Sequence, residues 1–505
     1  MIEIVLHNKL WIRFVTRDLT YLRAVKEHFS DKVANYWFQP KVQAGLWDGT
    51  ISVFDGRSKT LPYGLLGEVI QFHKEEFPNT PLTIAPEVKE LFRPPPIDIT
   101  FNLKFEPYDY QEASVRILLK YGKGIVRVAT AGGKSLIIAY LIDILRKNKL
   151  SKKSIIIVPR IGLINQFKSD LIDYNFDENL IGLIGDNYKE YDHPVIVSTW
   201  QSLNFMTGEK KNAKEKAKEK SQWLREYLKQ FDTVIVDEVH LAQSAVLKNI
   251  LGACTEAKFR FGVTGTLHDE RLDLLNTRSF LGPVLAEYSA ADLADSGHIS
   301  HCNAMMVQIK YDKRFPGSYD VVKNDVFNEP SRMEVIREII NNIDGTFLLL
   351  VGFVEKEGEV LEQYLKTAFP KRKVVFLHGD TSSEEREKWR KRANKEKDII
   401  LIATYGIFQL GINIPTLKYL ILASPFKAKI RVLQSIGRVL RKAAEKMDGA
   451  FVIDLWDQVR TLEKHGTIRI RHYIKEKFNI KEYIIFPDDR TDLDLLLSDI
   501  KIQSS

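Results

Sequence analysis

Short, almost purely apolar segments recur along this chain, and they constrain its fold more than any other feature. Each is rich in Ile and Val, and a stretch of helical character separates it from the next. The first series comprises Gly124–Val128, Ser154–Val158, Pro194–Val197 and Thr233–Val236. Strands that are apolar on both faces and alternate with helices are typical of a parallel sheet covered by helices on both sides. The pattern therefore predicts an α/β domain that begins near residue 105.

The same pattern returns near residue 300. The second series comprises Thr346–Val351, Lys373–Phe376, Ile399–Ala403, Tyr419–Ala423 and Ala450–Ile453. A chain of 505 residues is too long for one ordinary core. Two α/β domains in tandem, each built on a parallel sheet, are the predicted architecture.

The first 95 residues follow different rules. Strand-like patterns at 2–5, 11–15 and 51–54 are mixed with helical stretches at 19–29 and 65–73. Pro94, Pro95 and Pro96 then indicate a stiff linker, because proline fixes φ and cannot continue a helix or a central strand. We expect a small N-terminal α+β accessory domain. The predicted limits are 1–95 for the accessory domain, 96–297 and 298–457 for the two α/β domains, and 458–505 for a C-terminal tail.

The predicted tail divides by charge. Arg469, Arg471 and Lys475 form a basic part, which we expect to be able to touch nucleic acid. The acidic stretch 492–499 follows, and it is expected to be a solvated amphipathic end.

Composition narrows the class of partner and the compartment. The chain carries 74 Lys and Arg against 66 Asp and Glu, a formal net charge of +8, which favours a polyanionic partner such as nucleic acid. Two cysteines, Cys254 and Cys302, provide neither a disulfide framework nor a Cys-based zinc site. The first residues lack the apolar core of a signal peptide, and the longest apolar run, 347–354, is too short to span a bilayer. We therefore expect a cytoplasmic protein with no membrane partner.

A phosphate-binding loop is predicted after the first apolar strand. Small residues between that strand and the helical stretch 136–146 let backbone N–H groups surround a phosphate at the start of a helix. Lys134 would reach the β- and γ-phosphates of ATP, and the Ser135 hydroxyl would bind Mg²⁺. The residues expected to hold the nucleotide here are Thr130, Ala131, Gly132, Gly133, Lys134 and Ser135. The strict pattern has glycine where Val128 stands, so a glycine-rich turn without a ligand is the alternative for this segment alone.

Two adjacent carboxylates decide between these alternatives. Asp237 and Glu238 directly follow the apolar strand that ends at Val236, at the carboxyl end of the strand, where α/β sheets bind ligands. Asp237 is expected to hold Mg²⁺, and Glu238 to orient and deprotonate the attacking water. The pair downstream of Gly-Lys-Ser predicts an ATP hydrolase.

Together these residues resemble superfamily 2 helicases, which are built on two RecA-like domains with ATP-Mg²⁺ bound between them. The resemblance assigns the adenine-reading segment to 107–111, with Tyr108 and Gln111 as base contacts. The segments 159–166 and 198–201 match motifs that touch the nucleic-acid backbone, and the candidate contacts are Arg160, Thr199 and Gln201. Thr264-Gly265-Thr266 resembles the motif that couples hydrolysis to movement.

The second α/β domain continues the resemblance. The segment from Thr404 to Ile414 is similar to the fifth motif, in which Thr404 would contact nucleic acid and Gly411 the nucleotide. The segment 434–441 is similar to the sixth motif, in which Gln434 would contact the nucleotide and Arg438 and Arg441 are both candidates for the arginine finger. Two departures are Asn413, where many relatives carry an acidic residue, and Val239 in Asp-Glu-Val-His. Neither removes a group that hydrolysis needs.

Within the superfamily, the chain resembles the branch-migration DNA helicases of T-even phages. The segments 38–49 and 61–67 are similar to the accessory domain of that family, and 427–442 to its sixth-motif region. The resemblance implies that the protein acts on branched or double-stranded DNA in recombination, repair or replication. If the protein is encoded by a phage, it would act in the host cytoplasm. Aromatic and basic residues alternate in the same part of the chain: Trp37, Phe38, Lys41, Trp47, Arg57 and Lys59. They suit a nucleic-acid surface, although Trp47 beside Asp48-Gly49 is equally read as a buried anchor at a tight turn.

The expected function is therefore an ATP-dependent DNA helicase or translocase that unwinds or branch-migrates forked and four-way DNA. An RNA helicase and a duplex DNA translocase that never separates strands are the alternatives, because the motor motifs contact mainly backbone. A nucleotide-gated nucleic-acid clamp with vestigial hydrolysis is a third alternative, suggested by Val128 and Ala131.

Overall fold

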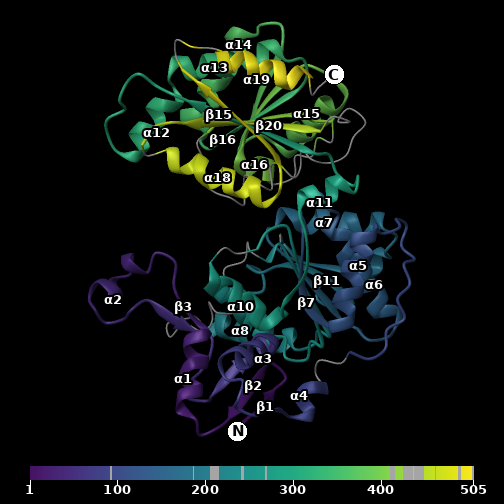
Figure 1. Ribbon diagram of the computed structural model, residues 1–505. Coiled ribbons are helices and arrows are strands. Elements are labelled where there is room, and N and C mark those ends of the chain that lie inside the picture. The colour runs from purple at the N-terminus through teal and green to yellow at the C-terminus, as the bar shows by residue number, and fades with distance from the viewer. Residues whose placement is uncertain are drawn as a thin grey trace. The chain divides into compact units, whose positions relative to one another are not determined.

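The structure is a computed structural model (Figure 1). It describes residues 1–90, 94–185, 187–204, 215–239, 244–267, 270–409, 414, 416–424, 436, 449–460, 462–486, 489 and 491–502. No helix in these ranges combines the length and the apolar character that crossing a membrane requires. The chain divides into two compact units, one made of residues 1–128 and 133–287 and the other of residues 129–132 and 288–505.

The first unit begins with a small α+β module. Its four-stranded sheet has the order β5-β2-β1-β6, and β1 pairs antiparallel with β2 and parallel with β6. A separate two-stranded ribbon is made of β3 and β4. The elements are β1 (Ile2–Asn8), β2 (Trp11–Val15), α1 (Leu19–His28), β3 (Ser30–Lys32), η1 (Tyr36–Phe38), α2 (Pro40–Gln43), β4 (Thr50–Ser52), β5 (Thr60–Pro62), η2 (Tyr63–Leu65), α3 (Leu66–Glu76), β6 (Leu82–Ile84) and α4 (Pro86–Glu90). Alternating apolar residues of β1 and β2 and the apolar faces of α1 and α3 close one core.

An eight-stranded sheet follows in the order β10-β9-β11-β8-β12-β13-β7-β14. The five pairings that join β9, β11, β8, β12, β13 and β7 are all parallel. Its strands are β7 (Lys123–Val128), β8 (Ser154–Val158), β9 (Ile181–Gly185), β10 (Tyr188–Lys189), β11 (Val195–Thr199), β12 (Thr233–Asp237), β13 (Phe259–Thr264) and β14 (Val284–Tyr288). Its helices are α5 (Asp109–Tyr121), α6 (Lys134–Lys147), α7 (Gly162–Asp173), η3 (Glu178–Leu180), α8 (Glu215–Leu228), α9 (Ser244–Ala253) and α10 (Arg271–Leu281). Helices lie on both faces of the sheet, α5 to α7 on one and α8 to α10 on the other (Figure 1).

The α+β module packs tightly on this sheet domain through α10. A Cβ on Gly64 would lie 2.3 Å from the backbone oxygen of Arg278, so only glycine fits between η2 and α10. The Arg278 guanidinium pairs with Glu68 of α3 at 2.8 Å. The ammonium of Lys123, at the start of β7, lies 3.4 Å from the centre of the Tyr63 ring. These contacts make the module and the first sheet domain one body.

The second unit holds a seven-stranded sheet in the order β17-β18-β16-β19-β20-β15-β21, and every pairing in it is parallel. Its strands are β15 (Cys302–Ile309), β16 (Phe347–Val351), β17 (Lys373–Leu377), β18 (Ile399–Thr404), β19 (Tyr419–Leu422), β20 (Ala450–Asp457) and β21 (Asn479–Ile485). Its helices are α11 (Ala290–Asp295), α12 (Tyr319–Phe327), α13 (Pro330–Asn342), η6 (Val354–Glu359), α14 (Val360–Ala368), α15 (Ser383–Lys395), α16 (Tyr405–Gln409), α18 (Glu463–Lys475) and α19 (Thr491–Ile502). Figure 1 shows α13, α14 and α19 on one face and α16 and α18 on the other.

The predicted fold class is confirmed: two parallel-sheet α/β domains follow a small α+β module. The strands expected from the apolar runs are all present, as β7, β8, β11, β12, β16, β17, β18, β19 and β20. Strands β9, β10, β13, β14, β15 and β21 of the two sheets are additional to those expected.

The last 48 residues differ from the expectation of a tail with a solvated end. Strand β21 pairs in parallel with β15, and α19 buries Leu493, Leu496 and Ile500 in the core of the second sheet. Arg469 does not reach the surface either, because it is 2% exposed and donates to both carboxylate oxygens of Asp454 at 2.6–3.0 Å. The leucines between the acidic residues outweigh the charge pattern, and two of the acidic residues bind β21. Asp492 accepts a hydrogen bond from the Ile484 N–H at 2.7 Å, and Asp499 accepts one from the Tyr483 hydroxyl at 2.6 Å.

Candidate active site

The loop between β7 and α6 is held in a conformation that few residues adopt. Ala131 has φ +75° and Gly133 has φ +65°, both in the left-handed region. A side chain costs about 1 kcal/mol or more there, so Ala131 holds a conformation that glycine would adopt at a lower cost. A Cβ on Gly133 would also lie 2.4 Å from Nε2 of Gln111, so this position requires glycine on two counts. Lys134 and Ser135 then begin α6.

Lys134 lies beside the two predicted carboxylates. Its Nζ is 3.1 Å from Oε1 of Glu238, and both side chains are only slightly exposed. Glu238 itself has φ +49°, a strained conformation that persists where the surroundings enforce it and that clusters at functional sites. The structure thus brings together the lysine and the carboxylates expected to perform hydrolysis.

Asp237 is the electrostatically unusual member of this group. Its Oδ1 atom is buried and has no hydrogen-bond partner among the described residues. Burial and the neighbouring Glu238 carboxylate raise the pKa of Asp237 to about 7, and the Lys134 ammonium opposes part of that rise. A buried carboxylate oxygen without a donor suits a divalent cation, because the cation would supply the missing charge.

The second oxygen of Glu238 is held by the segment that follows β13. Oε2 accepts a hydrogen bond from the Gly265 N–H at 3.0 Å and lies 3.3 Å from Oγ1 of Thr264. The Thr264 hydroxyl donates to the carbonyl of Thr266 at 2.7 Å. The motif expected to couple hydrolysis to movement therefore contacts the predicted catalytic base directly.

Sequence reasoning missed Tyr174. Its hydroxyl lies 2.7 Å from Oγ of Ser135, the predicted Mg²⁺ ligand. The Tyr174 ring packs edge-on against Phe105, whose carbonyl accepts a hydrogen bond from Tyr140 of α6. No local signal marks Tyr174, because it lies 39 residues from Ser135 and only the fold joins the two.

The adenine-reading segment connects to the phosphate loop through one side chain. Gln111 is 2% exposed; its Oε1 accepts from the Tyr108 N–H at 2.9 Å, and its Nε2 donates to the Gly133 carbonyl at 3.4 Å. The Tyr108 ring is half exposed, so one part of it faces solvent beside the loop. Gln111 thus joins the segment that contains the two predicted base contacts to the phosphate loop.

The predicted nucleic-acid contacts differ in exposure. Arg160 and Gln201 follow β8 and β11, which are neighbours in the sheet, and Gln201 is exposed. Thr199 is fully buried and accepts from the Ser202 N–H at 3.2 Å, so it shapes the turn that presents Gln201 and does not itself face solvent. Thr404 is the last residue of β18, and its side chain is buried. Four predicted residues lie outside the described part of the chain: Gly411, Gln434, Arg438 and Arg441.

The donor set around Lys134 fits ATP with Mg²⁺. It combines a lysine, a hydroxyl and an unsatisfied carboxylate at the carboxyl edge of a parallel sheet, after a loop that only small residues can form. These are the groups that bind a polyphosphate and its cation.

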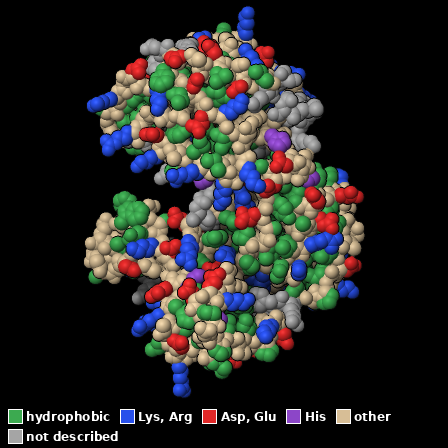
Figure 2. Space-filling view, viewed as in Figure 1, with side chains coloured by type: hydrophobic (Ala, Val, Ile, Leu, Met, Phe, Trp, Pro, Cys, Tyr) green, Lys and Arg blue, Asp and Glu red, His purple; other side chains and the backbone are tan. Residues whose placement is uncertain are grey.

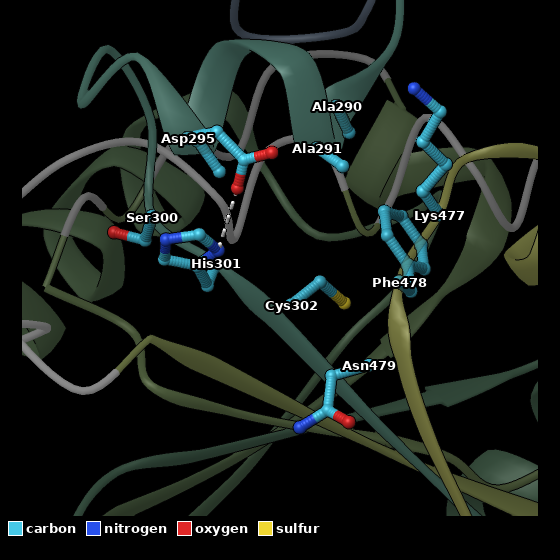
Figure 3. A pocket seen from close by; sticks show the side chains of 10 residues that line it. Ala290, Ala291, Asp295, Ser300, His301, Cys302, Lys477, Phe478 and Asn479 are labelled. Atoms are coloured by element: carbon cyan, nitrogen blue, oxygen red, sulfur yellow. Dashed lines mark ion pairs between the residues drawn. The ribbon is translucent and has the colours of Figure 1, made fainter.

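A cavity of about 210 Å³ in the second unit has different chemistry (Figure 3). Helix α11 and the ends of β15 and β21 line it, and Asp295 and His301 approach each other to 3.9 Å across its mouth. Lys477 pairs with Asp292 at 2.8 Å and fastens α11 beside the edge strand. Among the described residues no three His, Cys, Asp or Glu side chains cluster as a metal site would require.

Comparison with known proteins agrees with this geometry. The family model "type III restriction enzyme, res subunit" matches residues 104–269, and "helicase conserved C-terminal domain" matches 331–443. The N-terminal model of the DNA helicase UvsW matches residues 12–78.

Individual relatives extend the match. The ATP-dependent DNA helicase uvsW of Enterobacteria phage T4 is 27% identical over 95% of this chain and 98% of its own length. A Dbp5 structure of S. cerevisiae, bound to RNA and ADP BeF3, shares the fold over 79% of this chain and 94% of its own, with 17% identity and a TM-score of 0.53. The restriction-modification enzyme LlaBIII bound to DNA covers 84% of this chain and 34% of its own, with 16% identity and a TM-score of 0.55.

The matches to helicase models over two parallel-sheet domains and the lysine–carboxylate site are the features of an ATP-dependent helicase, and they resemble those of superfamily 2. Within that superfamily, the chain resembles the UvsW helicase of phage T4 along almost its whole length.

Proposed function

We propose that this helicase hydrolyses ATP to move on DNA and that it unwinds or branch-migrates forked and four-way DNA. The observation that carries the proposal is the contact of Glu238 with Lys134 on one side and Gly265 on the other, beside the unsatisfied Asp237. This arrangement joins a phosphate-binding cation, a base and a coupling segment in one site.

The residues divide the chemistry among them. Lys134 would bind the terminal phosphates and Ser135 and Asp237 would hold the cation, while Glu238 would orient the attacking water and accept its proton. The Mg²⁺-ATP complex would supply the phosphoanhydride bond and the divalent charge that stabilises the leaving oxygens. A phosphate at the loop competes with Glu238 for the Lys134 ammonium. Glu238 then keeps the Gly265 N–H as its partner and acts as the base.

The remaining site residues extend the proposal. Arg160, Gln201 and Thr404 contact the nucleic-acid backbone, with Thr199 shaping the turn before Gln201. The sixth-motif residues Arg438 and Arg441 serve as finger candidates; Gly411 and Gln434 contribute to nucleotide binding, together with Thr130, Ala131 and Gly132. We also propose the domain limits 1–95, 96–297 and 298–505. The pairing of β21 with β15 supports extending the last domain beyond the expected limit of 457.

DNA is favoured over RNA by the N-terminal part of the chain. The UvsW N-terminal model covers residues 12–78, and a relative that matches 95% of this chain is named an ATP-dependent DNA helicase. A duplex translocase is the second candidate, because the model that matches residues 104–269 describes a restriction-enzyme subunit.

The test is the steady-state ATPase rate with no nucleic acid, single-stranded DNA, linear duplex, a four-way junction and a structured RNA. Glu238→Gln is the matched control, because it keeps size and hydrogen bonding but removes the base. Strongest stimulation by the junction supports the proposal. Equal stimulation by linear duplex and junction favours the translocase, and stimulation mainly by RNA contradicts DNA as the substrate.

A further inference from the structure

Residues 33–49 form a small lobe on the α+β module, here named the tip lobe. The ribbon of β3 and β4 carries it, with Ser30 opposite Ser52 and Lys32 opposite Thr50. The lobe holds η1 and α2, and Figure 1 shows α2 carried away from the four-stranded sheet of the module beyond β3. It is therefore an extension of the module and not part of its core.

The tip lobe exposes three large apolar side chains. Trp37 is 53% exposed, Phe38 69% and Leu46 79%. Figure 2 shows hydrophobic side chains gathered on this lobe. Large apolar groups that cluster on a surface mark an interaction site more often than single exposed ones do.

The lobe holds these side chains in place from beneath. The Trp47 ring is half-buried and its Nε1 donates to the Thr50 carbonyl at 2.9 Å, so Trp47 is the anchor of the turn. Gly49 has φ +86°, and a Cβ there would lie 2.6 Å from Tyr36. The Tyr36 ring in turn packs edge-on against Trp37, at 5.3 Å between ring centres. Such preorganisation lowers the ordering cost of binding.

The charges of the tip lobe and of the β3–β4 ribbon indicate which kind of ligand the apolar side chains would bind. Two lysines, Lys32 and Lys41, are balanced by Asp31 and Asp48, so the lobe has no excess of cations with which to grip a run of phosphates. Its aromatic faces match the faces of bases, and Lys41 beside them suits the phosphate next to an exposed base. Duplex DNA offers base faces only where stacking is interrupted, as at a branch point.

We propose that the tip lobe stacks Trp37 and Phe38 on the bases exposed at the branch point of forked or four-way DNA. The proposal rests on the proposed function and names the part of the chain that recognises the branch.

The attachment of the lobe makes it useful to a motor. Arg271 of α10 donates a hydrogen bond to the carbonyl of His28, two residues before β3 begins, at 2.6 Å. The module also packs on α10 through Gly64 and Glu68. The first sheet domain therefore carries the tip lobe with it, so that movement along DNA presses the aromatic side chains against the branch.

The test uses the full-length protein with the double variant Trp37→Ala/Phe38→Ala and a four-way junction that carries 2-aminopurine at the branch point. Wild-type protein is expected to change the 2-aminopurine fluorescence by stacking, and the double variant to lose that change. Junction processing should fall about 5- to 150-fold, the effect of losing one stacked base.

Two further variants control for folding and for hydrophobicity alone. Leu19→Ala removes another exposed apolar side chain of the module, which is 64% exposed, and should behave as wild type. Trp37→Tyr keeps an aromatic face and should retain most of the fluorescence change.

The outcomes separate the two proposals. If wild-type protein processes the junction and the double variant equals it, the tip-lobe proposal alone is overturned. If no DNA stimulates the wild-type ATPase, the proposed function fails and the tip-lobe proposal falls with it. If the double variant keeps the fluorescence change but loses self-association in sedimentation, the lobe binds a second copy and the DNA proposal is wrong.

Discussion

Asp237→Asn should stabilise the protein while it abolishes ATP turnover. The unfolded chain ionises Asp237 near its ordinary pKa of 3.8, whereas burial and Glu238 raise its pKa to about 7 in the folded protein. At pH values between these two pKa values, Asp237 is therefore protonated in the folded protein and ionised in the unfolded chain. Stability falls as pH rises through this window, because the native state binds more protons than the unfolded state.

The size of the effect follows from the shift. About three pKa units correspond to about 4 kcal/mol of destabilisation at pH 8, about 1.7 kcal/mol at pH 5 and almost none below pH 4. Asparagine carries no charge at any of these values, so the variant avoids the penalty. Coupling to Lys134 and local relaxation reduce the gain, and we expect about 1–3 kcal/mol at pH 8.

Urea unfolding at pH 4, 5 and 8, without nucleotide, measures this difference. The variant should be more stable than wild type at pH 8, and the gain should shrink toward pH 4. Glu226→Gln is the control, because Glu226 is 61% exposed and its ion pair with Lys229 lies at the surface. A gain that is absent at pH 8, or that does not change with pH, would refute the electrostatic account of Asp237.

The remaining predictions concern hydrolysis, the cation and the module interface. Glu238→Gln should reduce ATP turnover by at least about 10²-fold while nucleic-acid binding survives, measured by ATPase and fluorescence anisotropy; retained turnover contradicts the assignment. Tyr174→Phe frees the Ser135 hydroxyl and should lower the Mg²⁺ concentration needed for half-maximal ATPase; an unchanged Mg²⁺ dependence removes Tyr174 from the site. Gly64→Ala should destabilise the first unit by about 1–3 kcal/mol because its Cβ meets the backbone of α10. Gly67→Ala, with nothing within 4 Å, should stabilise it by about 0.5–1 kcal/mol in thermal unfolding.

The sequence was sufficient for nine strands whose interiors are continuously apolar, and a polar residue inside the sheet explains one of the strands that it missed. Strand β13 was missed because Arg260 interrupts its apolar run. In the structure Arg260 is fully buried, and its guanidinium donates to the carbonyls of Leu251 at 3.0 Å and Ala257 at 3.2 Å, at and after the end of α9. Only the tertiary fold supplies those acceptors, so the strand could not be recognised from local pattern.

The candidate site also contains residues that the sequence could identify and residues that only the fold brings together. Lys134, Asp237 and Glu238 follow strands at recognisable spacings, and the sequence named them. Tyr174 contacts Ser135 only because α7 packs beside α6. The positive φ of Glu238 and the raised pKa of Asp237 are likewise consequences of packing, which no spacing records.

The most direct test of a branch-specific ATP-driven motor is strand exchange on a labelled four-way junction. The account predicts conversion of the junction to forked duplexes with ATP and Mg²⁺, no conversion with a non-hydrolysable ATP analogue, and none by Lys134→Ala. Conversion by Lys134→Ala, or by wild type with the analogue, would contradict an ATP-driven mechanism at this site. An intact junction despite vigorous ATP turnover would contradict branched DNA as the substrate.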